Sequence, residues 1–138
     1  MFLKGLGKYS DFGLLVIRIV LGGMFMYYGS PKLFGGPQAW AQLGGAMQSV
    51  SIGFMPAFWG FMAAFSMFVG GACVILGLFF RIFTILLFLT MAVATSMHFK
   101  KGDGLMIASH AMEDGTVFFG LTFIGPGKYS LDALLKLF

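Results

Sequence analysis

The stretch PAFWGFMAAFSMFVGGACVILGLF, Pro56–Phe79, is apolar from end to end and contains no charged residue. A helix needs about 20 mostly apolar residues to cross the hydrocarbon core of a bilayer. The stretch therefore predicts a membrane-spanning helix, around which the rest of the chain has to be arranged.

Three further stretches are long and mostly apolar, and they flank the first on both sides: Phe12–Gly29, Ile82–Phe99 and Met106–Ile124. Hydrophobic residues make up 59% of the 138 residues and charged residues only 10%, against roughly 25% charged in a typical soluble domain. We therefore expect an all-α integral membrane protein, in which residues 1–138 form one four-helix bundle.

The charges and the cysteine exclude other classes of protein. The nine basic residues lie singly along the chain, apart from the adjacent Lys100 and Lys101, so no clustered basic patch for nucleic acid is formed. A single cysteine, Cys73, excludes an intramolecular disulfide and a CxxC redox pair.

Four spans would place both termini on one side of the membrane. Five lysines and arginines lie on that side and three on the other: Lys4, Lys8, Arg81, Lys128 and Lys136 against Lys32, Lys100 and Lys101. By the positive-inside rule, we expect a multi-pass protein of the cell inner (plasma) membrane with cytoplasmic termini.

The one long connection, Pro31–Met55, separates the first two spans. Within it, Trp40, Leu43, Met47 and Val50 follow one another at helical spacing. This pattern predicts an amphipathic helix over residues 38–50 that lies in the outer interface, with Trp40 at headgroup depth. The Gly44–Gly45 pair weakens the helical pattern.

The second span carries small residues in two rows. One row is Ala63, Ser66, Gly70, Cys73 and Gly77, and the other is Gly60, Ala64 and Gly71. Small residues allow helix backbones to approach closely in lipid. We therefore expect this span at the centre of the bundle.

The fourth span contains two adjacent acids, Glu113 and Asp114, and the first span contains Arg18. Ionised groups at such depth cost several kcal/mol unless they are paired or hydrated, although the magnitude is contested. One hypothesis is an ion pair between Arg18 and either acid that fixes the helix register.

The other hypothesis is a polar site, because one arginine cannot neutralise two carboxylates. His110 lies one helical turn before both acids, and His98, Lys32 and Tyr28 are expected at a similar outer level. Such a cluster suits a small hydrated cavity. Its spacing matches no HxxH or HxxEH motif, and we expect no metal site.

Several motifs in this order resemble the DoxX family of small four-helix membrane proteins. They are the early arginine Arg18, YYGSPKLFGG at residues 27–36, MFVGGACVILGLFFR at 67–81, and GPGKYSLD at 125–132. The resemblance extends over nearly the whole chain. One departure is Met67, where family members often carry a glutamate ahead of the glycine pair.

The resemblance implies a membrane component of redox systems, since relatives include the small subunit of a thiosulfate:quinone oxidoreductase. Three functions follow as hypotheses: a subunit that interacts with quinone, a non-catalytic membrane anchor or assembly partner, and a small transporter or proton path. For the first, the expected proton relay is His110, Glu113 and Asp114, with Arg18, Lys32, His98 and Tyr28 around the headgroup. Because the chain has no electron-carrier motif, it would not be catalytic alone, and a protein partner within the lipid bilayer is expected.

Overall fold

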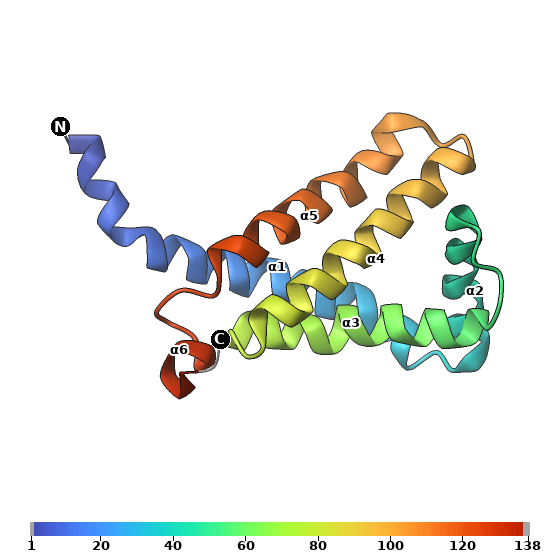
Figure 1. The fold of residues 1–138 in the computed structure, drawn as a ribbon, viewed down its shortest axis with the longest axis horizontal. Helices are drawn as coiled ribbons and strands as arrows, with labels where there is room; N and C mark the ends of the chain where they lie inside the picture. Colours follow the sequence, from blue (N-terminus) through green and yellow to red (C-terminus); the bar gives the residue numbers. More distant parts are fainter. Residues whose placement is uncertain (1, 137–138) are drawn as a thin grey trace.

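The computed structural model describes residues 2–136, and within them the chain is almost entirely helical and has no strand (Figure 1). The long helices are α1 (Ser10–Leu33), α3 (Pro56–Leu76), α4 (Phe80–Lys100) and α5 (Gly104–Ile124). The short ones are η1 (Phe2–Tyr9), α2 (Pro37–Gly44), η2 (Gly45–Val50) and α6 (Leu131–Leu135). The expected all-α fold is confirmed, and α1 continues past the predicted span end, through Pro31 to Leu33.

Three segments within residues 2–136 are long and apolar enough to cross a membrane: Leu3–Leu33, Pro56–Leu76 and Phe80–Lys100. The chain is therefore a membrane-embedded protein. Helix α5 has 21 residues, as α3 and α4 do, but it contains His110, Glu113 and Asp114 and is not among these segments. A fourth span remains a prediction.

Glycines bring α1 and α3 into close antiparallel contact. A Cβ on Gly22 would meet the carbonyl oxygen of Gly71, and a Cβ on Gly71 would meet that of Gly22. Further along the same pair, a Cβ on Gly29 would meet the side chain of Met67 at 2.8 Å. On another face of α3, Gly70 lies against Phe83 and Leu87 of α4. Helix α3 thus contacts several helices, as its rows of small residues predict.

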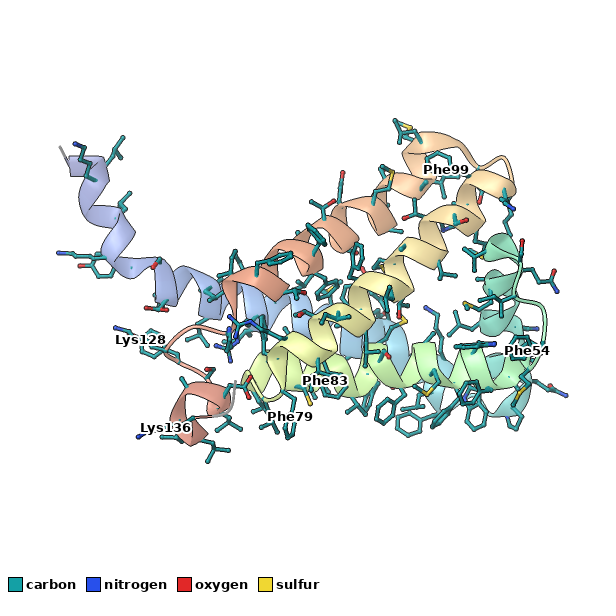
Figure 2. All side chains as sticks on the ribbon, in the orientation of Figure 1. Phe54, Phe79, Phe83, Phe99, Lys128 and Lys136 are labelled. Carbon is teal, nitrogen blue, oxygen red and sulfur yellow. The ribbon has the colours of Figure 1, made fainter. Side chains whose placement is uncertain are left out.

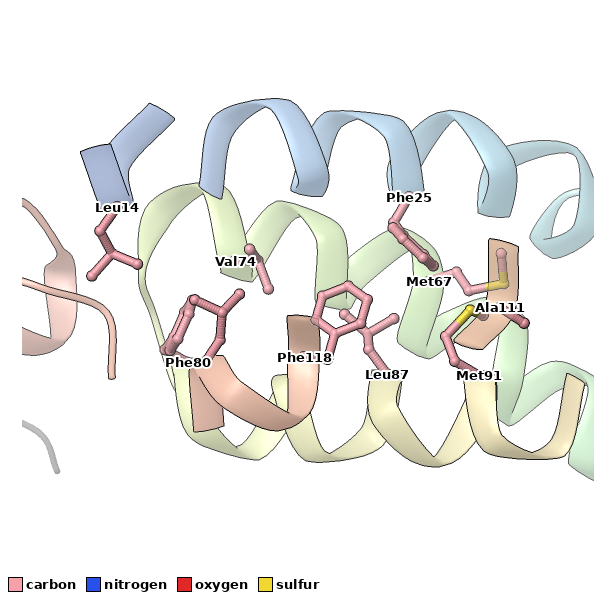
Figure 3. Packing of buried hydrophobic residues seen from close by; sticks show 10 residues of the cluster. Leu14, Phe25, Met67, Val74, Phe80, Leu87, Met91, Ala111 and Phe118 are labelled. Atoms are coloured by element: carbon pink, nitrogen blue, oxygen red, sulfur yellow. The ribbon is translucent and has the colours of Figure 1, made fainter. Parts of the chain in front are cut away.

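Helices α4 and α5 form a second antiparallel pair, and the two pairs run at an angle to each other (Figure 1). The Thr122 hydroxyl donates to the Thr84 hydroxyl at 3.0 Å, and Arg81 Nε donates to the Thr122 carbonyl at 2.9 Å. Apolar side chains fill the space between the pairs, and Phe25 meets Phe118 edge-on with ring centroids 5.0 Å apart (Figure 3).

The connection between α1 and α3 differs from its prediction. Instead of one helix over residues 38–50, α2 ends at Gly44 and a 3-10 helix, η2, follows from Gly45 to Val50. The cause is packing: a Cβ on Gly44 would collide with the Pro56 carbonyl, and one on Gly60 with the Trp40 carbonyl. Helix α2 crosses the end of α3 (Figure 1). Its position in the membrane interface remains a prediction.

The two ends of the molecule carry different segments of the chain. Phe79, Lys128 and Lys136 lie at one end, which we call the terminal end, whereas Phe54 and Phe99 lie at the opposite end (Figure 2). We call the latter the loop end, because it carries α2, η2 and the turn between α4 and α5 (Figure 1).

Candidate functional site

Arg18 is buried at the terminal end, with 1% of its surface exposed. Its Nε donates to the Val74 carbonyl at 2.9 Å, and one terminal nitrogen donates to the Ile75 carbonyl at 2.6 Å. The other terminal nitrogen donates to the carbonyls of Tyr129 at 2.8 Å and Pro126 at 3.2 Å. The last carbonyls of a helix lack intrahelical partners and carry partial negative charge, so Arg18 satisfies the C-terminal turn of α3.

Asp132 completes the same assembly from the C-terminal segment. Its two carboxylate oxygens accept from the backbone N–H groups of Phe79 and Phe80, each at 2.8 Å. Its own N–H donates to the Gly77 carbonyl at 3.0 Å. The carboxylate thus accepts hydrogen bonds from backbone N–H groups at the start of α4. We call Arg18, Asp132 and the backbone groups that they bind the Arg18–Asp132 clamp.

The predicted ion pair between Arg18 and the acids of α5 is wrong. Among the described residues, the Arg18 guanidinium binds four backbone carbonyls and no carboxylate within 4 Å. The reason is depth: its partners lie at the last turn of α3 and in the segment after α5, whereas Glu113 lies nine residues into α5. The carboxyl group that influences Arg18 electrostatically is that of Asp132.

The other predicted site residues do not form one cluster either. His110, Asp114 and Tyr28 line a groove between α1 and α5. Lys32 and His98 line a separate cavity at the loop end. Glu113 is exposed and lines neither. The sequence placed these groups at similar depth, but it could not show which faces of α1, α4 and α5 point toward each other.

The cavity at the loop end lies between η2, α2, α3 and α4 and has a volume of about 550 Å³. Most of its wall is apolar, with Leu43, Met47, Met67, Met91 and Met97 among the lining residues. Met67, the position at which the chain departs from the expected glutamate, is therefore a cavity residue. Binding sites for small molecules have this size range and character.

Trp59 lines the cavity and supplies its most unusual group. Its indole Nε1 is buried, and it is the one buried side-chain nitrogen or oxygen without a hydrogen-bond partner in the described part of the chain. By contrast, Trp40 Nε1 donates to the Leu33 carbonyl at 3.0 Å. A buried donor without a partner costs about 1–3 kcal/mol. Trp59 thus lines the cavity with its side chain and carries a buried N–H donor that has no partner.

Two lysines and an imidazole also border this cavity: Lys32, Lys101 and His98. His98 Nδ1 lies 2.9 Å from the carboxylate oxygen Oδ2 of Asp103, in the turn before α5. This contact fixes the orientation of the imidazole ring, as carboxylates do for histidines at many sites. Sequence reasoning missed Trp59, Lys101 and Asp103. The sequence feature that could have marked Trp59 as a candidate site residue is its position one turn after Pro56, at the outer end of a predicted span.

The groove between α1 and α5, which we call the α1–α5 groove, has a volume of about 510 Å³. Its α1 wall includes Val16, Val20 and Met24, and its α5 wall includes His110, Asp114 and Val117. Asp114 is half-buried there, and its electrostatic neighbours are His110 and Glu113. No group of three or more potential metal ligands is present among residues 2–136.

Comparison with known families identifies the chain. The DoxX family model matches residues 13–100, which is more than half of the chain. The chain belongs to the DoxX family. No curated protein and no solved structure matches it.

The matched range of this DoxX protein covers α1 to α4 and ends before α5. The resemblance expected at residues 125–132 thus lies outside the range, although that segment completes the Arg18–Asp132 clamp. Most of the loop-end cavity is formed by matched elements, whereas His110, Glu113 and Asp114 lie beyond them.

Proposed function

We propose that this DoxX protein is the membrane subunit of a redox system and that its loop-end cavity binds a quinone-like headgroup. The observation that carries the proposal is Trp59, whose side chain lines a largely apolar cavity of about 550 Å³ and whose buried N–H group has no partner. A quinone ring is apolar, and its two carbonyl oxygens accept hydrogen bonds. A carbonyl oxygen would give the Trp59 donor the partner that it lacks, once the indole turns its N–H group toward the cavity.

The charge of the cavity supports the same ligand class. Lys32, His98 and Lys101 border it, while no carboxylate is among its lining residues. Cationic and N–H groups favour electron-rich oxygens, and they favour them more strongly when reduction adds negative charge to the ring.

His98 is the group best placed to exchange a proton with the headgroup. It lines the cavity, its Nδ1 is held by Asp103, and the side chain of Asp103 is 31% exposed. The dyad thus connects the cavity wall with water at the loop end. None of His110, Glu113 and Asp114 is among the residues that line the cavity. The proton relay expected for them remains a prediction.

Electrons would come from a protein partner, in accord with the redox systems that the family resemblance implies. The second hypothesis, a membrane anchor without a ligand, makes the opposite prediction for the cavity: it would bind no quinone.

Replacing Trp59 with phenylalanine tests the proposal, because Trp59→Phe keeps an aromatic ring and removes the N–H donor. We expect affinity for a short-chain ubiquinone or menaquinone analogue to fall about 3- to 10-fold, the net value of one hydrogen bond. The measurement is isothermal titration of the full chain in lipid nanodiscs.

Trp40→Phe is the matched control, because Trp40 does not line the cavity and its N–H already has a partner. We expect it to leave the affinity unchanged. Equal losses in both variants, or no measurable binding to the wild-type protein, would contradict the proposal and favour the anchor.

A further inference from the structure

The two walls of the α1–α5 groove carry rows of side chains against which another helix could pack. Val16, Val20 and Met24 follow at steps of four along α1, and they are 44%, 61% and 43% exposed. The facing wall on α5 has His110, Asp114 and Val117 at steps of four and three. Rows at these spacings run along each helix axis, so the groove between them can receive the ridge of a third helix.

The helices that form the groove each pack mainly on a different partner. Helix α1 packs on α3 and α5 packs on α4, and α1 and α5 meet through the rings of Phe25 and Phe118. All residues that line the groove belong to α1 and α5, so it lies on the side of the molecule away from α3 and α4.

One carboxyl group lies in the wall of this groove, in the middle of α5, and a second lies on the same helix just outside the groove. Asp114 is half-buried in its wall, and Glu113 beside it is exposed. Both lie nine or more residues from either end of α5, or at least about 13 Å at 1.5 Å per residue. In a spanning α5 they would face the hydrocarbon core, where ionised groups without a counter-charge cost several kcal/mol.

The described part of the chain supplies no lysine or arginine to these acids. Arg18 is held by backbone carbonyls in the clamp, and Arg81 donates to the Thr122 carbonyl near the end of α5. The one ion pair within 4 Å among residues 2–136 joins His98 to Asp103. Among the described residues, the basic group that influences Asp114 electrostatically is His110, which lies one turn away and is exposed.

We infer that the α1–α5 groove docks a membrane-spanning helix of a partner protein that carries a lysine or arginine at mid-depth. The apolar rows pack against the partner helix, and its basic side chain compensates Asp114 in the groove wall. A second copy of this chain does not fit, because its described cations lie in the clamp, on backbone carbonyls or near the helix ends. The inference is independent of what the loop-end cavity binds.

A designed membrane peptide can serve as the probe: a leucine–alanine helix with one central arginine, compared with the same helix carrying leucine there. Energy transfer from the labelled full chain to the labelled peptide in phosphatidylcholine vesicles measures association. We expect the arginine peptide to bind at least about tenfold more tightly than the leucine peptide.

The variants locate the interaction. Asp114→Asn and Glu113→Gln together should abolish the preference for the arginine peptide, whereas Asp103→Asn, an acid outside the groove, should retain it. Val20→Trp fills the groove from its α1 wall and should weaken binding of both peptides.

Equal binding of the two peptides to the wild-type chain would overturn the inference, as would no binding of either. It would also be overturned if the preference survived the double variant or if Val20→Trp bound both peptides as the wild type does. Quinone binding is titrated on the same samples. Because peptide binding and quinone binding are then measured separately, either proposal can fail while the other holds.

Discussion

The buried Arg18 side chain donates four hydrogen bonds to backbone carbonyls at the terminal end of the molecule. Arg18→Met would keep the approximate length of the side chain and remove all four donors. We expect a loss of about 3–5 kcal/mol, the range for removing one partner from a buried charged contact. Lys128→Met, an exposed cation at the same end, should stay within about 0.5 kcal/mol of the wild type.

Thermal unfolding in detergent compares these variants. Adding Glu113→Gln to Arg18→Met distinguishes the clamp from an ion pair with α5. Because Arg18 contacts no acid of α5, the second change should recover none of the lost stability. Recovery in the double variant would mean that the two side chains interact.

Helix α5 is the long helix whose crossing of the membrane the sequence leaves most open. Its bounds, Gly104–Ile124, agree closely with the predicted stretch Met106–Ile124, but its polar residues distinguish it from α1, α3 and α4. Its antiparallel packing along α4 and its 21 residues, about 31 Å at 1.5 Å per residue, favour a fourth span.

Cysteine labelling of whole cells decides whether α5 crosses. In a Cys73→Ser background, single cysteines replace Lys8, Lys101 or Lys136. With four spans and cytoplasmic termini, a membrane-impermeant maleimide should label only Lys101→Cys until the cells are permeabilised. External labelling of Lys136→Cys, with Lys8→Cys protected, would mean three spans.

Over the whole molecule, the sequence predicts features that depend on one helix at a time, such as its length and the residues that share a face. Apolar length predicts α3 and α4, and the small residues Gly70 and Gly71 predict close packing of α3. Features that depend on several helices at once could not be predicted. The carbonyl partners of Arg18 come from segments 56 and more residues away, and backbone acceptors leave no mark in a sequence.

The candidate site shows the same division. His98 and Lys32 were expected near a headgroup, and both line the cavity. Trp59 was missed, because its unpartnered N–H depends on where η2 and α4 pass. His110 and Asp114 were grouped with His98 and Lys32 by depth alone, yet their faces of α5 turn toward α1.

Photolabelling with an azidoquinone tests the central claim most directly. The full chain in lipid nanodiscs is illuminated with the probe, and the modified residues are located by mass spectrometry. We predict labelling around the loop-end cavity, at Met47, Trp59 or Met97, that excess unlabelled quinone suppresses. Labelling of the α1–α5 groove instead, or labelling that the competitor leaves unchanged, would contradict a quinone site in the cavity.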